Sequence, residues 1–447
     1  MMRHAWLMAL AGISWGASPV DSVFAPYTAP GSPGCAVGVL ERGKVALAKG
    51  YGLANLDDAI PLTAKSRFYM ASVSKQFTSM AALMAEREGR LALNDPLSRH
   101  FPEMPAYAAH IPLRRMLDHT AGLRDYLTLW GLKGWSNESV LTEAPTLSLI
   151  ARQKALDFEP GSAYSYSNSG YFLMALLIER ISGQRLDDYL QQRLFRPLGM
   201  TATGFQHDHA VPVPNRAQGY RRDKDAWRTA GVGFDVVGSG GLYSNIEDML
   251  RWASHFDDPK ADAALLDLLQ TPGHLTNGDE TPRGYALGLI RDHASGLTRI
   301  SHAGGATGYR TFFLRFPEKK LSVVTLCNAG NANPEDLSMR VAAAYLPALQ
   351  PDAKPPAAQS TPRTAPPPGD RQALTGLYYS GELQTVWRIV ERGGRLYRQS
   401  DGGESEILRD AKGTLTVAGA TIVPGKDGFS VSAGRAHDIQ FRAAPAE

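Results

Sequence analysis

A stretch rich in proline, alanine and polar residues interrupts this chain at residues 349–371. Proline has no backbone N–H and disfavours both helix interiors and central strands, so we predict that this stretch is a linker. The chain has 447 residues, which is more than one ordinary domain requires. The sequence therefore predicts a large domain before the linker and a smaller domain over residues 372–447.

Strand-like runs open and close the large segment, and helical patterns lie between them. Residues 35–52 predict a β-hairpin, and four further strand runs follow at residues 285–292, 298–304, 309–316 and 321–328. The clearest helices begin near Ser72 and over residues 170–183, and each ends at a glycine. Because short connections join the closing strands, we expect an antiparallel sheet flanked by helices, in an α+β domain.

The C-terminal segment has a different pattern. Residues 372–447 contain seven or eight short β-rich runs separated by turns rich in glycine and aspartate, with no clear helix. This pattern predicts a small all-β barrel or sandwich. We expect this domain either to cover or shape the mouth of a site on the large domain or to mediate assembly.

The charge of the chain is nearly balanced, with 47 Lys and Arg residues against 44 Asp and Glu residues. No dense basic stripe is visible, so we expect no nucleic-acid partner. After residue 20 there is no apolar run long enough to span a membrane.

The first sixteen residues have the pattern of a secretory signal peptide. Arg3 and His4 supply a positive start, residues 5–13 are apolar, and small residues occupy positions 14 and 16. An ordinary N-terminal extension is the alternative. We predict a signal peptide at residues 1–16 and a periplasmic or secreted protein.

The two cysteines, Cys35 and Cys327, lie in strand-like runs at opposite ends of the large segment. If these strands pair antiparallel, the start of one strand meets the end of the other and a disulfide is feasible. Two buried free thiols are the alternative, and we favour them.

A serine and a lysine three residues apart, Ser72 and Lys75, form the only S-x-x-K in the chain. Positions i and i+3 share a helix face, so the hydroxyl and the amine can meet. An unperturbed lysine is a poor base at neutral pH, but burial and cationic neighbours can lower its pKa. The pattern predicts a nucleophile and its base, although a serine cap and a surface lysine would have the same spacing.

The tripeptide Tyr-Ser-Asn occurs twice. Tyr166 could shuttle a proton near a lysine, and Asn168 could bind an acyl group or orient that lysine. The second copy is Tyr243-Ser244-Asn245, where Ser244 and Glu247 match a capping box. We therefore assign the functional role to the first copy.

His302 lies on a predicted strand and is followed by Gly304 and Gly305. Small residues let a substrate approach a strand edge. His302 could hydrogen-bond a substrate carboxylate or the catalytic tyrosine, although a lone strand histidine is often only packed.

Other enzyme classes lack their motifs. The chain has no H-E-x-x-H and no phosphate-binding G-x-x-x-x-G-K-S/T, and its one G-x-S-x-G, at residues 12–16, lies within the predicted signal peptide and not in a strand–turn–helix elbow. His207 and His209 lie in a proline-rich loop without obvious acidic partners. We expect no metal and no cofactor.

Taken in order, SVSK, YSN and HAG resemble the S-x-x-K, Y-x-N and H-x-G motifs of the β-lactamase and penicillin-binding-protein superfamily of serine hydrolases, in its class C branch. The flanks are similar too, in LDHTAGLRDY (117–126), GSGGLYSNIEDML and HAGGATGYRTFF. This resemblance covers about residues 33–348. The C-terminal segment, which begins LTGLYYSGEL, resembles more loosely the lipocalin-like domain of some of these hydrolases.

The resemblance implies that Ser72 becomes acylated while Lys75 and Tyr166 transfer protons. Tyr166 would protonate the leaving group and later activate water. Asn168 would position the acyl group, and His302, Gly304 and Gly305 would bind substrate. The backbone N–H groups of Ser72 and Gly305 would form the oxyanion hole.

The resemblance leaves the substrate open among small amides, D-amino-acid peptides and esters. D-aminopeptidase or D,D-carboxypeptidase and esterase roles are the leading hypotheses. Because histidine replaces a lysine at position 302, the fixed cation for a β-lactam carboxylate is missing, so β-lactamase activity ranks lower. A non-catalytic penicillin-binding protein is a further alternative. We expect a small-molecule or short-peptide substrate, and a homo-oligomer stays open.

Overall fold

The computed structural model describes residues 19–135, 139–258, 260–349, 363–400 and 403–444. The predicted signal peptide at residues 1–16 and the linker residues 350–362 lie outside these ranges. Within them, no helix combines the length and the apolar character needed to cross a bilayer.

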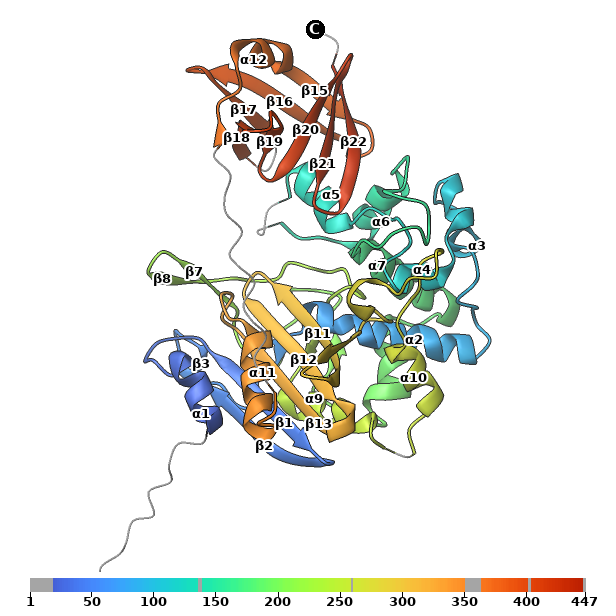
Figure 1. Cartoon of the computed structure of the whole chain (residues 1–447), viewed down its shortest axis with the longest axis vertical. Helices are drawn as coiled ribbons and strands as arrows, with labels where there is room; N and C mark the ends of the chain where they lie inside the picture. Colours follow the sequence, from blue (N-terminus) through green and yellow to red (C-terminus); the bar gives the residue numbers. More distant parts are fainter. Residues whose placement is uncertain (1–18, 136–138, 259, 350–362, 401–402, 445–447) are drawn as a thin grey trace, which may run out of the picture.

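The large domain is built on one antiparallel sheet of six strands, in the order β10-β11-β12-β13-β1-β2. The strands from the start and the end of the domain therefore lie side by side, which confirms the α+β prediction (Figure 1). Their bounds are β1 Cys35–Glu41, β2 Lys44–Tyr51, β10 Ile290–Ala294, β11 Leu297–Ala306, β12 Tyr309–Phe316 and β13 Leu321–Cys327.

Both faces of the central strands β1, β12 and β13 are buried. Successive side chains of a strand point to opposite faces. Val37 and Val39 of β1 accordingly pack in a core shared with helices α1 (Pro19–Phe24) and α11 (Pro334–Tyr345). Ala36 and Leu40 belong to the second and larger core, together with helix α9 (Ile246–His255). The sheet thus separates two layers of helices.

The first residue of β1 and the last residue of β13 are the two cysteines. Cys35 lies directly opposite Cys327 in the register of these strands, and the two form a disulfide. The antiparallel pairing foreseen for these strands is confirmed, whereas the preference for free thiols is wrong. The sequence did not show that the two residues share one register position.

The part of the chain between β2 and β10 in sequence forms a mostly helical region. Helix α2 (Lys75–Arg87) runs through its centre, buried on all sides from Lys75 to Ala85, as expected for a helix inside a large core. The other helices are α3 Leu97–His100, α4 Leu113–Leu117, α5 Tyr126–Lys133, α6 Glu143–Ala151, α7 Asn168–Ser182, α8 Leu186–Leu190 and α10 Ala263–Gln270. Short strands complete it: β3 Leu53–Asn55, β4 Ile60–Pro61, β5 Phe68–Tyr69, β6 Gly204–Phe205, β7 Tyr220–Asp223, β8 Ala226–Thr229 and β9 Leu242–Ser244.

Several predicted boundaries shift. The helix expected from Ser72 begins as a 3₁₀ turn over Ala71–Ser74 and becomes α-helical at Lys75. The strand predicted from residue 285 begins only at Ile290.

The predicted cap of α9 is also wrong. Asn245, not Ser244, caps this helix, because the Asn245 side chain accepts the Asp248 N–H. The Ser244 hydroxyl lies 2.8 Å from that of Thr203 instead.

The C-terminal domain is a closed barrel of eight strands, because β18 pairs with both β17 and β19. The strands are β15 Gly376–Ser380, β16 Thr385–Arg392, β17 Arg395–Ser400, β18 Gly403–Asp410, β19 Leu415–Val417, β20 Ala420–Gly425, β21 Gly428–Ala433 and β22 Ala436–Ala443. Strand β14 (Arg363–Thr364) pairs with β18, and helix α12 (Pro368–Leu374) follows β14. Both elements begin inside the stretch predicted as a linker.

The barrel packs against helix α5 (Figure 1). Leu129 and Leu132 of α5 belong to the same hydrophobic core as Trp387 of the barrel, and the Trp387 indole N–H donates to the Leu132 carbonyl at 3.1 Å. A buried ion pair between Arg124 and Glu382, at 2.7 Å, also joins the domains. Helix α5 thereby links the barrel to the region that holds the candidate site.

Candidate active site

Ser72 sits in the 3₁₀ turn that precedes helix α2. The residue before it, Ala71, has a φ of +47°, in the left-handed region that costs energy for a residue other than glycine. The Met70 carbonyl accepts a hydrogen bond from the Thr311 hydroxyl at 2.9 Å, which ties this turn to the sheet. Strain of this kind is common where a fold fixes a reactive side chain.

Lys75 lies one turn further along and is fully buried. Its Nζ atom is 3.1 Å from the Ser72 Oγ, 2.8 Å from the Asn168 Oδ1 and 2.7 Å from the Ser239 carbonyl oxygen. A neutral amine has two N–H donors and one lone pair. Because the amide and carbonyl oxygens only accept, they take both donors and leave the lone pair to face Ser72.

The surroundings of Lys75 favour this neutral form. Burial lowers the pKa of Lys75 well below its usual range, the Asp125 carboxylate opposes this shift, and Arg435 supports it. A lysine with a lowered pKa can accept a proton at neutral pH. The predicted pair of Ser72 and Lys75 is thus brought together in a geometry suited to proton transfer.

Asn168 is the first residue of helix α7, whose cap is Ser167. Its amide Nδ2 donates to the Asp125 Oδ1 at 2.7 Å, and its backbone N–H donates to the same oxygen at 2.7 Å. Since a carboxylate only accepts, the Nδ2 must face Asp125 and the Oδ1 must face Lys75. Asp125 therefore sets the orientation of the Asn168 amide.

Tyr166 lines the same cavity as Ser72, and its phenol lies close enough to interact with the Ser72 hydroxyl. The centroid of the Tyr166 ring is 4.9 Å from the Lys75 Nζ and 4.1 Å from the centroid of the His119 ring. Burial raises the pKa of Tyr166, while its interaction with Ser72 and the charge of Arg435 oppose that shift. The phenol is therefore held in its protonated form.

His302 is buried beside this group but does not engage Tyr166 by a hydrogen bond. Its Nδ1 is 2.7 Å from the Ala303 carbonyl, an acceptor, so Nδ1 carries the proton of the neutral ring. Its Nε2 lies 3.1 Å from the Tyr285 hydroxyl. Burial and nearby Lys75 lower the pKa of His302 to about 3, so His302 supplies no positive charge.

The two glycines after His302 differ in their surroundings. Gly304 is buried, and a Cβ there would lie 2.2 Å from the Thr311 Oγ1 and 2.3 Å from the Met70 carbonyl. Glycine at this position lets β11 approach the turn that carries Ser72. Gly305 is exposed and lines the cleft beside Ser72, where a substrate carbonyl would lie.

Two cavities meet at Ser72. One is lined by Ser72, Asn168 and Gly305 with residues of the neighbouring loops: Tyr69, Ala71, Tyr126, Leu127, Phe234, Ser239, Gly240 and Ala306. The other is lined by Ser72 and a set rich in aromatic residues: Tyr164, Tyr166, Pro282, Arg283, Tyr285, Ile290, His302 and Ala303. Of the residues predicted from the sequence, all except Lys75 and Gly304 line one of these cavities.

Four residues of the site were not assigned roles from the sequence: Asp125, Ser239, Tyr285 and His119. His119 and Asp125 lie within the LDHTAGLRDY flank, and Ser239 lies within GSGGLYSN. His119 has a φ of +62°, and its Nδ1 accepts the Ser167 N–H at 3.2 Å. The similar flanks were the available signal, but only the structure shows which of their side chains reach the site.

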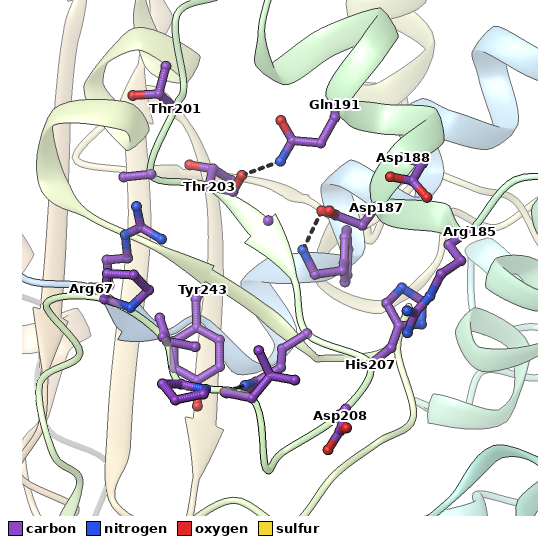
Figure 2. A pocket seen from close by; sticks show the side chains of 18 residues that line it. Arg67, Arg185, Asp187, Asp188, Gln191, Thr201, Thr203, His207, Asp208 and Tyr243 are labelled. Atoms are coloured by element: carbon purple, nitrogen blue, oxygen red, sulfur yellow. Dashed lines mark hydrogen bonds between the residues drawn. The ribbon is translucent and has the colours of Figure 1, made fainter.

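A separate pocket lies away from this cleft, and none of the predicted site residues lines it. Asp187 accepts the Phe205 N–H and Gln191 donates to the Thr203 carbonyl (Figure 2). These two side chains of the pocket are therefore already hydrogen-bonded to the protein backbone. Tyr243, from the second Tyr-Ser-Asn, lines this pocket.

His209 has an acidic partner that the sequence does not show. Its Nδ1 lies 2.9 Å from the Asp235 Oδ1, and Asp208 brings a further carboxylate near this pair. His207 faces Glu179 at 3.8 Å.

The family described as Beta-lactamase matches residues 20–347. A D-aminopeptidase of Cereibacter sphaeroides (strain ATCC 17029) is 29% identical over 401 residues, which cover 88% of this chain and 73% of that protein. A D-aminopeptidase of Brucella anthropi is 33% identical over 302 residues, covering 66% of this chain and 56% of its own length. The chain thus spans little more than half of the second relative.

Solved structures show the same fold. The octameric penicillin-binding protein homologue from Pyrococcus abyssi has a TM-score of 0.64 at 21% identity, over 89% of this chain and 91% of its own. The D-amino acid amidase from Ochrobactrum anthropi SV3 has a TM-score of 0.62 at 22% identity, over 74% and 97%. With the family match over most of the large domain, the chain belongs to the beta-lactamase family and is a serine hydrolase of that family.

Proposed function

We propose that this protein hydrolyses amides of D-amino acids or short D-peptides through an acyl-enzyme on Ser72. The observation that carries this proposal is the position of Lys75, whose two N–H donors are taken by Asn168 and Ser239 while its third contact is Ser72. The similarity to two D-aminopeptidases supports the D-amino-acid substrate class.

In the first half of the reaction, neutral Lys75 takes the Ser72 proton as Oγ attacks the substrate carbonyl carbon. The backbone N–H groups of Ser72 and Gly305 would bind the oxyanion. The C–N bond then breaks, and the leaving amine receives a proton from Tyr166, which is replaced from Lys75. An ester on Ser72 and a free amine result.

In the second half, water attacks the ester and Ser72 leaves with a proton. We assign Lys75 as the base in this half as well, because burial raises the pKa of Tyr166 and makes its phenolate costly. Tyr166 keeps the donor role alone, which narrows the role that the family resemblance implies.

β-Lactamase activity is the weaker alternative. His302 is neutral, since burial lowers its pKa to about 3. It therefore offers no cation at the position where a β-lactam carboxylate would need one. Ester hydrolysis needs the same catalytic groups and is expected as a side activity.

A substrate panel tests the proposal. D- and L-amino-acid p-nitroanilides, p-nitrophenyl esters and nitrocefin would be compared on the wild type and on Ser72→Ala. We expect the D-p-nitroanilides to be preferred and Ser72→Ala to lose at least about 1000-fold in kcat/KM. The acyl-enzyme should appear as a mass increase on the peptide that contains Ser72.

Ser74→Ala is the matched control. The Ser74 hydroxyl faces the Leu242 N–H, not Lys75, so this variant should keep its activity. Turnover that survives in Ser72→Ala would overturn the mechanism. A label on Ser72 that never turns over with any member of the panel would favour a binding protein.

We also propose that the protein is exported to the periplasm or secreted. The pattern of residues 1–16 supports export, and a disulfide between Cys35 and Cys327 fits an oxidising compartment. Cell fractionation with N-terminal sequencing tests this, and a cytosolic protein with an intact N-terminus would contradict it.

Assembly into a homo-oligomer is a further proposal, supported by the likeness to an octameric protein. Light scattering on the purified protein tests it, and a monomeric mass would contradict it.

A further inference from the structure

We propose that the C-terminal barrel completes the active site through Arg435, a positioning residue that pairs with Asp125 and so balances the charge next to the base Lys75. This inference rests on the proposed function, because it takes Lys75 to be the base. It assigns the barrel a part in the chemistry of the other domain.

The turn between β21 and β22 carries Arg435 to the start of helix α5. The Arg435 backbone carbonyl accepts the Asp125 N–H at 2.9 Å, and its guanidinium pairs with the Asp125 Oδ2 at 3.0 Å. The guanidinium carbon also lies 5.4 Å from the centroid of the Tyr166 ring. One residue of the barrel therefore contacts both the carboxylate behind the site and the ring of the proton donor.

Asp125 passes this contact on to the catalytic lysine. Its Oδ1 accepts the backbone N–H and the side-chain Nδ2–H of Asn168, while its Oδ2 accepts the Thr128 N–H and forms an ion pair with the Arg435 guanidinium. The Asn168 Oδ1 then holds the Lys75 Nζ at 2.8 Å. An unbroken series of polar contacts thus runs from Arg435 through Asp125 and Asn168 to Lys75.

The charges in this series explain why a cation is needed. The Asp125 side chain is fully buried, and a buried carboxylate without a partner would favour a protonated lysine nearby. Protonated Lys75 has no lone pair to accept the Ser72 proton. The positive charge of Arg435 offsets that of Asp125, so Lys75 can remain neutral.

The groups around Lys75 come from several elements, and Arg435 is the arginine whose charge acts on the pKa of Lys75, while Arg283 lines the cavity beside Ser72. They are Asp125 before α5, Tyr166 before α7, Tyr171 on α7, His119 after α4, His302 on β11 and Arg435. Burial lowers the pKa of both histidines, so they are neutral at the working pH. Arg435 is therefore the fixed cation of this set.

Loss of the Arg435 charge can be separated from loss of barrel docking. The barrel is also held by the buried pair of Arg124 and Glu382 and by Trp387, whose indole N–H donates to the Leu132 carbonyl. His437, two residues beyond Arg435, pairs with Asp157 at 3.3 Å. A variant at position 435 should thus keep the domains together.

The test is the pH dependence of kcat/KM in the full-length protein for the wild type, Arg435→Met, Arg435→Lys and the control His437→Gln. Without the arginine charge, the pKa of Lys75 should rise, and the acid limb of the profile should move to higher pH by about one unit. Activity should fall about tenfold below the limb and recover above it. Arg435→Lys should restore most of the wild-type profile, and His437→Gln should match the wild type.

Two measurements do not depend on the proposed substrate class. The rate at which a fluorophosphonate labels Ser72 should show the same shift of its acid limb, and the NMR titration of ¹³Cε-labelled Lys75 should report the raised pKa directly. Failure of every substrate with a shifted labelling profile would overturn the proposed substrate and support the role of Arg435.

Three outcomes would overturn the role of Arg435. The first is an unchanged acid limb with an unchanged Lys75 titration in Arg435→Met. The second is a loss confined to KM for substrates with a free carboxylate, which would make Arg435 a substrate-binding residue. The third is an equal loss at every pH that Arg435→Lys does not rescue, with a lowered melting temperature, which would make it a structural residue.

Discussion

The tripeptide Tyr-Ser-Asn occurs at residues 166–168 and again at residues 243–245, and each copy lies at the start of a helix. In the first copy Ser167 is the cap, so Asn168 is the first helical residue of α7. In the second copy Asn245 is itself the cap of α9. The two helices therefore begin one residue apart relative to the same three residues.

This offset decides what each asparagine does. The Asn245 Oδ1 accepts the Asp248 N–H and thereby caps helix α9. The Asn168 side chain is released from that task and reaches Lys75 and Asp125. The register of a helix cap, which three residues alone do not set, therefore separates the copy that we propose to be catalytic from the structural one.

The tyrosines diverge in the same way. Tyr166 lines the cleft at Ser72. Tyr243 packs edge-on against Tyr69, with ring centroids 5.4 Å apart, and lines the pocket of Figure 2. Substitutions at matched positions of the two copies should therefore differ in their effects on activity.

The largest effect is expected from Asn168→Ala. The variant removes one of the two acceptors that orient the Lys75 amine, and kcat/KM should fall at least about 100-fold. Steady-state kinetics measure this, with circular dichroism to verify the fold. Activity within threefold of the wild type would mean that Asn168 does not orient the base.

A somewhat smaller loss is expected from Tyr166→Phe, which keeps the ring and deletes the proton donor. Here kcat should fall about 100-fold for a p-nitroanilide, and less for a p-nitrophenyl ester, whose leaving group needs no proton. Tyr243→Phe is the matched control and should stay within twofold. Equal losses from both variants, or on both substrates, would contradict the donor role.

The smallest effect is expected from Asn245→Ala. Loss of a helix cap should lower the free energy of unfolding by about 1 kcal/mol, while kcat/KM stays unchanged. Urea denaturation of the full-length protein measures the change. A large loss of activity with unchanged stability would show that the second copy also has a catalytic role.

Much of the fold follows from local patterns. The β-rich runs around residues 35–52 and 309–328 are joined by short turns, as in hairpins, and their strands form as predicted. Patterns were weaker at residues 285–289, which are apolar but buried in a turn, since an apolar run reports burial without reporting conformation. The pairing of Cys35 with Cys327 depended on the relative register of two distant strands, so the sequence left it open.

The candidate site also combines contacts that follow from local spacing with contacts between distant segments. Spacing by itself determined that Ser72 and Lys75 could meet, because i and i+3 lie on one face within a single helical turn. Tertiary structure alone decided that Asp125 orients Asn168, that His302 pairs with Tyr285, and that Arg435 of the barrel reaches Asp125. Local geometry follows from the covalent chain, whereas these contacts join segments far apart in sequence, which only the packing of α5, α7, the sheet and the barrel brings within hydrogen-bonding distance.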